Sequence, residues 1–310
     1  MPQQIQRTLI LLIGMHRSGT SMCANIINHL GIPLAKNAKS AIGEDNQKGY
    51  FEDLDLARQQ DCFLKQLNSH WGNTTPLTLD TNSVPAKRAL DYIGNYLNQE
   101  FQHTDTLCIK DPRVCRLLPL WLIAAQNLNI NVQTITLIRD PEQVCASLHR
   151  RDGMPLIQGK LLWIRYYLEA INSIIDKNNT TIFFDEVVRN PQIIKQSLEK
   201  LQVEHNNADP YSVITPGLIN HKSISINDEH LPQLKNYREN KTALLSTLNQ
   251  WQEDLANSIS IEDYNNLVNY TYNILNDAAD HARKIRNLEW TIKNKTDRSF
   301  IKKIIHRLCG

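Results

Sequence analysis

Short apolar runs alternate with longer amphipathic segments along the N-terminal part of the chain. The run Thr8–Ile13 (TLILLI) stops at Gly14, and similar runs recur at 106–109, 134–138 and 180–184. Continuous apolar runs of this length are typical of strands that are buried on both faces, as in a parallel sheet. The sequence therefore predicts four buried parallel strands.

Apolar residues at helical spacing fill the segments between these runs. They predict helices over 21–30, 114–127, 141–150 and 155–176, and later over 241–256 and from 261 to about 286. The polar stretch 206–240 contains three prolines and predicts irregular structure. We therefore expect an α/β fold in three layers, a P-loop-like parallel sheet with helices on both faces, over residues 1–260. A helical C-terminal extension is expected over 261–310.

Composition and charge narrow the class of protein. Hydrophobic residues make up 41% of the 310 residues, and 34 basic against 32 acidic side chains give a net charge of +2. These values are typical of a globular protein and disfavour a nucleic-acid binder that relies on bulk charge. The six cysteines have no metal-ligand spacing, so we expect buried, reduced thiols. Without a signal-peptide pattern or a run long enough to span a bilayer, a cytoplasmic protein is expected.

The segment Gly14–Ser21 (GMHRSGTS) follows a predicted strand and opens a predicted helix. Backbone N–H groups at such a turn form an anion site. Its glycine spacing is that of a nucleotide P-loop, but Thr20 stands where that loop has its lysine, and Arg17 is the cation that remains. No carboxylate that could bind a magnesium ion follows a partner strand in a compelling position. This weakens the interpretation of the chain as a nucleoside triphosphatase or kinase. The alternative is a turn that binds no ligand.

Lys110 follows the second predicted strand, at the edge where ligands of parallel sheets bind. There it could stabilise a leaving anion, whereas the neighbouring Asp111 is expected to cap the helix that begins near Val114.

Arg139 follows the third predicted strand, and Ser147 lies on the helix after it. These two side chains could close on a second phosphate from opposite sides. Alternatively, Arg139 only pairs with Asp140 or Glu142.

Together these segments resemble the sulfotransferase family that uses 3′-phosphoadenosine 5′-phosphosulfate (PAPS). The loop 16–21 is similar to the family's 5′-phosphosulfate-binding motif in its arginine form, residues 139–141 with Ser147 are similar to its 3′-phosphate-binding motif, and 110–112 are similar to the lysine segment near the sulfuryl group. The blocks 45–52, 163–165 and 185–191 also fit. The resemblance covers about residues 8–205.

This resemblance implies a transferase that moves a sulfuryl group from PAPS to an acceptor hydroxyl, of a saccharide or glycolipid, with no metal. It assigns the sulfuryl-transfer chemistry to Arg17, Lys110 and a carboxylate base, and binding of PAPS to Arg17, Ser18, Gly19, Thr20, Ser21, Arg139 and Ser147. A base is expected because a hydroxyl is a poor nucleophile. Glu52 in 49–52 is the best match, and Glu44 and Asp45 remain alternatives. Glu52 can also be read as a first-turn residue that favours the helix dipole.

Two other functions remain open, a P-loop kinase with a displaced lysine and a non-catalytic nucleotide-binding or partner-docking module. The tail from Arg283 to Gly310 has nine basic and two acidic side chains. Within it, 299–309 predicts a helix with one apolar face, which either packs on its own domain or makes a peripheral contact with anionic lipid.

Overall fold

The structure is a computed structural model that describes residues 6–39, 49–175, 178–214 and 230–258, with 260, 262, 263, 266 and 270. The chain divides into a first unit, Met1–Ser258, and a second unit, Ile259–Gly310. Glu44, Asp45, the tail 299–309 and almost all of the predicted helix at 261–286 lie outside the described residues. The elements below belong to the first unit.

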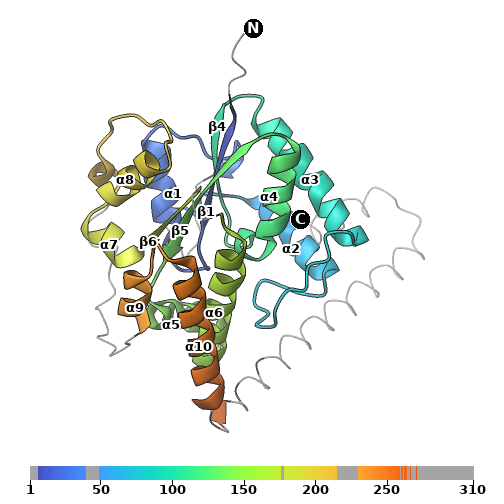
Figure 1. The fold of residues 1–310 in the computed structure, drawn as a ribbon, viewed down its shortest axis with the longest axis vertical. Coiled ribbons are helices and arrows are strands. Elements are labelled where there is room, and N and C mark those ends of the chain that lie inside the picture. Colours follow the sequence, from blue (N-terminus) through green and yellow to red (C-terminus); the bar gives the residue numbers. More distant parts are fainter. Residues whose placement is uncertain are drawn as a thin grey trace, which may run out of the picture. The chain divides into compact units, whose positions relative to one another are not determined.

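A parallel four-stranded sheet forms the centre of this unit (Figure 1). Its order is β4-β1-β5-β6, and its strands are β1 (Thr8–Ile13), β4 (Thr106–Lys110), β5 (Asn131–Ile138) and β6 (Asn179–Phe183). All four predicted strands are confirmed. β5 begins earlier than predicted because Gln133, although polar, is buried in the strand. A short antiparallel pair, β2 (Ala38–Lys39) with β3 (Glu52–Asp53), lies apart from this sheet.

Helices cover both faces of the sheet, which confirms the predicted three layers (Figure 1). On one face, Ile10 and Leu12 of β1 belong to a core cluster with residues of α1, α7 and α8. Because side chains alternate along a strand, Leu9 and Leu11 point to the opposite face, where α4 lies. The helices are α1 (Thr20–His29), α2 (Leu54–Gln66), α3 (Val84–Glu100), α4 (Val114–Asn127), α5 (Pro141–Asp152), α6 (Leu156–Ser173), α7 (Phe184–Arg189), α8 (Gln192–Lys200), α9 (His230–Asn236) and α10 (Lys241–Ser258).

Four helices, α3, α7, α8 and α9, were not among those predicted from the sequence. The stretch 206–240 is not wholly irregular, since it contains a 3-10 turn at Pro210–Val213 and α9, where Pro232 lies in the first turn and is tolerated there. The helix α3 was not predicted, although Ser83 accepts a hydrogen bond from the Ala86 N–H at its start and proline follows in the first turn. A polar cap followed by proline is a helix-start signal that could have found it.

Four of the described cysteines, Cys23, Cys108, Cys115 and Cys145, are buried free thiols, whereas Cys62 is exposed. The expectation of buried thiols is therefore wrong for Cys62, which lies on the solvent side of α2. Within the described residues, the helices are too short or too polar for any of them to cross a membrane.

Two helical glycines provide a matched test of this packing. A Cβ on Gly159 of α6 would lie 2.9 Å from the Cys145 Sγ of α5, whereas a Cβ on Gly94 of α3 would meet nothing within 4 Å. We expect Gly159→Ala to lower the free energy of unfolding by about 1–3 kcal/mol through overpacking. Gly94→Ala should raise it by about 0.5–1 kcal/mol through helix propensity. Urea unfolding measures both, and an unchanged stability of Gly159→Ala would contradict the close contact of α5 with α6.

Candidate active site

The carboxyl ends of the parallel strands bring the predicted site residues to one edge of the sheet. Gly14 follows β1, Lys110 ends β4, Arg139 follows β5 and Phe184 follows β6. The chain leaves β1 for β4 on one side and then crosses back to β5 on the other side. The loop after β1 therefore lies at the switch point of the strand order, where ligands of open α/β sheets bind.

The loop between β1 and α1 opens the helix without a capping side chain. Arg17 and Gly19 have left-handed backbone conformations, with φ of 68° and 89°, and Gly19 is the N-cap of α1. No side chain of this cap bonds the first N–H groups of the helix. The ring of Phe184 lies where a Cβ of residue 19 would be, at 2.2 Å, so only glycine fits. Uncapped N–H groups at a helix start favour an anion.

Arg17 contacts both residues of the predicted arginine-serine clamp, Arg139 and Ser147, beside this loop. The Arg17 Nε donates to Ser147 Oγ at 2.9 Å, and an Arg139 guanidinium nitrogen donates to the Arg17 carbonyl oxygen at 2.9 Å. The other contacts of the Arg139 guanidinium are neutral: Gln143 Oε1 at 3.1 Å and the face of Phe184 at 4.4 Å. Arg139 is only 8% exposed. A buried cation with neutral partners is a candidate for binding an anion.

The alternative for Arg139, pairing only with a neighbouring carboxylate, does not fit these contacts. Asp140 accepts a hydrogen bond from the Gln143 N–H and caps α5, and Glu142 pairs with Lys160 of α6. Burial and the nearby charge of Arg17 lower the pKa of Arg139 to about 10, although the charge of Asp140 opposes this shift. The structure thus holds two arginines close together at a cost that a bound anion would relieve.

Lys110 is in contact with Glu52, the best of the base candidates. The Lys110 Nζ donates to Glu52 Oε1, to the Tyr50 carbonyl oxygen at 3.0 Å and to Ser21 Oγ at 3.2 Å, which uses all its N–H groups. The side chain of Lys110 is 3% exposed and that of Glu52 is 12% exposed. This contact joins the end of β4 to β3, so Glu52 lies at the same edge as the loop.

The position of Glu52 is fixed by its neighbours on both sides. Asp53 caps α2 by accepting from the Leu56 N–H at 3.2 Å, and it accepts from the Tyr96 hydroxyl at 3.1 Å. Phe51 has a φ of 53°, which is strained for a side chain of this size. Glu52 therefore precedes the helix instead of lying in its first turn, so the interpretation of Glu52 as a first-turn residue of α2 is wrong.

Burial raises the pKa of Glu52, and the charge of Asp111 adds to this rise while Lys110 opposes it. A carboxylate with a raised pKa binds a proton more readily than an exposed one, which suits a general base.

The loop hydroxyls are placed differently from the expectation. Ser18 is fully buried, and its Oγ lies 3.2 Å from the Tyr167 hydroxyl. Because the Tyr167 proton goes to the Leu137 carbonyl, Ser18 is the donor in this pair and its hydroxyl does not point to a ligand. Ser21 donates to the Tyr50 carbonyl oxygen at 3.1 Å. Thr20 is buried, with its methyl group towards Gly14. Phosphate contacts of this loop would thus come from Arg17 and the backbone.

The sequence missed several residues that support the site. The expectation that Asp111 caps α4 is wrong, because the start of this helix has no side-chain cap hydrogen bond. Asp111 is fully buried and accepts instead from the Arg113 N–H at 2.9 Å, one residue before the helix, and from Gln60 Nε2 at 2.7 Å. Arg116 is 2% exposed and donates to the backbone of the 70–75 loop as well as to Glu169. No spacing rule reveals these partners, because they are far apart in the sequence. Phe184, in contrast, ends a predicted strand, and the edge rule could have found it.

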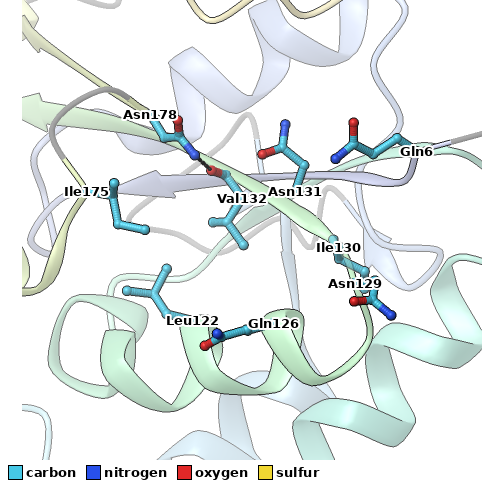
Figure 2. Close-up of a pocket in the computed structure, with 9 residues that line it drawn as sticks. All are labelled: Gln6, Leu122, Gln126, Asn129, Ile130, Asn131, Val132, Ile175 and Asn178. Carbon is cyan, nitrogen blue, oxygen red and sulfur yellow. Dashed lines mark hydrogen bonds between the residues drawn. The ribbon is translucent and has the colours of Figure 1, made fainter.

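A pocket of about 520 Å³ lies elsewhere, at the amino end of β5 (Figure 2). Its lining residues are Gln6, Leu122, Gln126, Asn129, Ile130, Asn131, Val132, Ile175 and Asn178. None of these side chains is charged, so the pocket offers no counter-charge to a phosphate. In the described part of the chain, no three His, Cys, Asp or Glu side chains gather as metal ligands would.

Comparisons with solved structures give the following likenesses. The sulfotransferase domain from the Synechococcus PCC 7002 olefin synthase is 16% identical, with a TM-score of 0.41, and the match covers 84% of this chain and 98% of that domain. The sulfotransferase domain from the curacin biosynthetic pathway is 16% identical, with a TM-score of 0.40 and coverage of 79% and 90%. A sulfotransferase from Alicyclobacillus acidocaldarius is 13% identical, with a TM-score of 0.40 and coverage of 78% and 95%.

All three are sulfotransferases. This is the family that the motifs at 16–21, 110–112 and 139–147 resemble. No family model matches the chain, and no curated protein matches it. At identities of 13–16% and TM-scores of 0.40–0.41, these likenesses carry no argument about the function of this chain.

The contact between Gly19 and Phe184 is open to a double-mutant test. Gly19→Ala places a Cβ in the Phe184 ring at a φ of 89°, so we expect a loss of about 2–4 kcal/mol in the free energy of unfolding. Phe184→Ala removes the ring, so the double variant should lose less than the sum of the single variants. Urea unfolding of the three variants measures this coupling. Strictly additive losses would contradict the packing of Phe184 on the loop.

Proposed function

We propose that this protein is a sulfotransferase that moves the sulfuryl group of PAPS to a hydroxyl of an acceptor, with a saccharide or glycolipid as the acceptor class. The observation that carries the proposal is the grouping of Arg17, Arg139 and Ser147 beside the uncapped start of α1. We assign two anion positions to this grouping, one at Arg17 with the start of α1 and one at Arg139 with Ser147. The donor has two separated anionic groups, the 3′-phosphate and the 5′-phosphosulfate.

In the proposed complex, Arg17 and the backbone N–H groups at the start of α1 bind the 5′-phosphosulfate. Arg139 and Ser147 bind the 3′-phosphate. Ser147 Oγ accepts from Arg17, so its own hydrogen can be donated to a phosphate oxygen. Binding of the 3′-phosphate would also relieve the repulsion between the two arginines.

The transfer is an in-line displacement at sulfur. The acceptor oxygen forms a bond to sulfur while the bond from sulfur to the bridging 5′-phosphate oxygen breaks, and that oxygen keeps the electron pair. The acceptor proton passes to the Glu52 carboxylate. Lys110 stabilises the charge that develops on the leaving phosphate, which is the largest kind of contribution in such reactions.

Because Lys110 is in contact with Glu52, the proposed reaction depends on the order in which PAPS and the acceptor bind. All N–H groups of Lys110 are engaged without a ligand, so one bond must break before Lys110 reaches the leaving phosphate. Exchange of Glu52 for the phosphate frees the carboxylate at the moment when the sulfuryl donor is in place. Binding of PAPS before the acceptor follows from this exchange.

Three further features agree with this function. Trp71 is partly exposed, and an indole face suits a sugar ring. The free thiols agree with a reaction in the cytoplasm. A kinase is disfavoured because Thr20 replaces the phosphate-loop lysine and, with its side chain buried against Gly14, does not take over that role.

Arg139 is tested through the 3′-phosphate. Arg139→Ala should weaken binding of adenosine 3′,5′-bisphosphate by about 10- to 100-fold, because a charge-assisted hydrogen bond is lost. Binding of AMP, which lacks the 3′-phosphate, should change much less. Isothermal titration calorimetry measures both affinities, and Arg150→Ala, which removes an exposed arginine of α5, is the matched control. Equal losses for both nucleotides would show that Arg139 only holds the loop.

Glu52 is tested by Glu52→Gln, which keeps a hydrogen-bond acceptor for Lys110 and removes the charge. Sulfuryl transfer should fall by about 10²- to 10⁴-fold, as for loss of a general base. Binding of adenosine 3′,5′-bisphosphate should become tighter, because Lys110 is released from its ion pair.

The pH dependence gives a second measurement of Glu52. The base must be ionised, and its pKa lies above the ordinary 4.5, so the rate should rise with pH through a midpoint above that value. This acid limb should vanish in Glu52→Gln. Transfer of radiolabelled sulfate from PAPS to a panel of cell-derived glycans and lipids measures the rates. Loss of the rate in Glu44→Gln or Asp45→Asn instead would move the base to that residue.

A further inference from the structure

His16 is the loop residue that the proposed mechanism leaves without a role. It directly precedes Arg17, yet the two side chains contact different elements. Arg17 bonds Ser147 of α5, whereas the His16 ring lies 4.9 Å from the Trp71 ring and 5.9 Å from the Tyr166 ring, measured between centroids. The Arg17 side chain therefore contacts α5, whereas His16 contacts α6 and the loop that carries Trp71.

Hydrogen bonds within the protein hold the residues around His16. The Tyr166 hydroxyl donates to the Trp71 carbonyl oxygen at 2.8 Å. Arg116 donates to the carbonyl oxygens of His70 and Asn73, both at 2.9 Å, on either side of Trp71. Hydrogen bonds within the protein thus hold Tyr166 and the backbone around Trp71, whose rings flank the imidazole of His16.

One nitrogen of this ring has no partner. The His16 Nε2 is buried, and within the described residues nothing forms a hydrogen bond with it. Leaving a buried polar atom unpaired is costly, and native proteins seldom do so unless water or a ligand supplies the partner.

The ring is also uncharged in a strongly positive environment. Burial lowers the pKa of His16 well below 6.5, and the charges of Arg113, Arg151, Lys110 and Arg17 lower it further. At neutral pH one ring nitrogen therefore carries a hydrogen without a positive charge. Cations on several sides of a neutral N–H group favour an anionic partner for it.

We infer that the His16 Nε2 donates a hydrogen bond to an oxygen of the sulfuryl group of PAPS. This inference rests on the proposed function, since Arg17 and Lys110, two of the cations around the ring, are the residues proposed to hold the 5′-phosphosulfate. A neutral donor supports the charge on the sulfuryl oxygens and does not compete with Glu52 for the acceptor proton. Adenosine 3′,5′-bisphosphate, the product, has no sulfuryl group and loses this contact.

The test compares binding of PAPS with binding of adenosine 3′,5′-bisphosphate in the absence of acceptor. In His16→Ala, PAPS should bind about 10-fold more weakly, as for loss of a hydrogen bond to a charged group, while binding of the bisphosphate should stay within about twofold. His16→Gln places an amide N–H near the position of Nε2 and should retain most of the PAPS affinity. His16→Asn places its amide near Nδ1 instead and should behave like His16→Ala. Thermal unfolding of each variant shows whether it is folded.

Each other outcome overturns the inference in a recognisable way. An unchanged preference for PAPS in His16→Ala means that Nε2 has an internal water as its partner. Equal weakening of both nucleotides, with no rescue by His16→Gln, means that His16 only shapes the loop. A wild-type protein that binds neither nucleotide better than AMP overturns the proposed function itself, and this is seen before any variant is made.

Discussion

The site depends on one electrostatic constraint, the burial of Arg139 beside Arg17. The two positive charges repel each other, and burial removes the water that would screen this repulsion. The fold nevertheless holds them together: Arg139 bonds the Arg17 backbone, Arg17 bonds Ser147, and Phe184 covers the Arg139 guanidinium. Such an arrangement is costly without an anion and favourable with one. The Phe184 ring also requires glycine at position 19, while Asp140 caps α5 and Glu142 pairs with Lys160.

In the second pair, Lys110 with Glu52, the two charges attract each other instead of repelling. Here unlike charges are buried together, and a ligand must separate them before either can act. The two pairs lie at the same edge of the sheet because β1, β4 and β5 all end there. An anion that satisfies the arginine pair can therefore also draw Lys110 away from Glu52. The proposed coupling between donor binding and base release needs no movement of the sheet.

The sequence allowed the strands of the sheet and the residues at its edge to be predicted. It did not allow the hydrogen-bond partners of these residues to be predicted. Buried strands such as 8–13 and 106–109 are visible because an apolar run has few alternatives, and the edge rule then places Arg17, Lys110 and Arg139 together. In contrast, the role of Ser18 was misread, because its hydroxyl is used by Tyr167, which is 149 residues away. The helix α9 was missed because a proline in its first turn resembles a break. Contacts between distant segments have no local pattern, so these features needed the structure.

The account is tested most directly by the affinity of the unmodified protein for adenosine 3′,5′-bisphosphate relative to AMP. Both nucleotides carry the 5′-phosphate, so their difference isolates the second anionic group. If Arg17, Arg139 and Ser147 form a clamp for two phosphates, calorimetry should show the bisphosphate bound at least about 100-fold more tightly, as expected for several charge-assisted hydrogen bonds. Equal affinities would contradict the clamp and with it the proposed sulfuryl transfer.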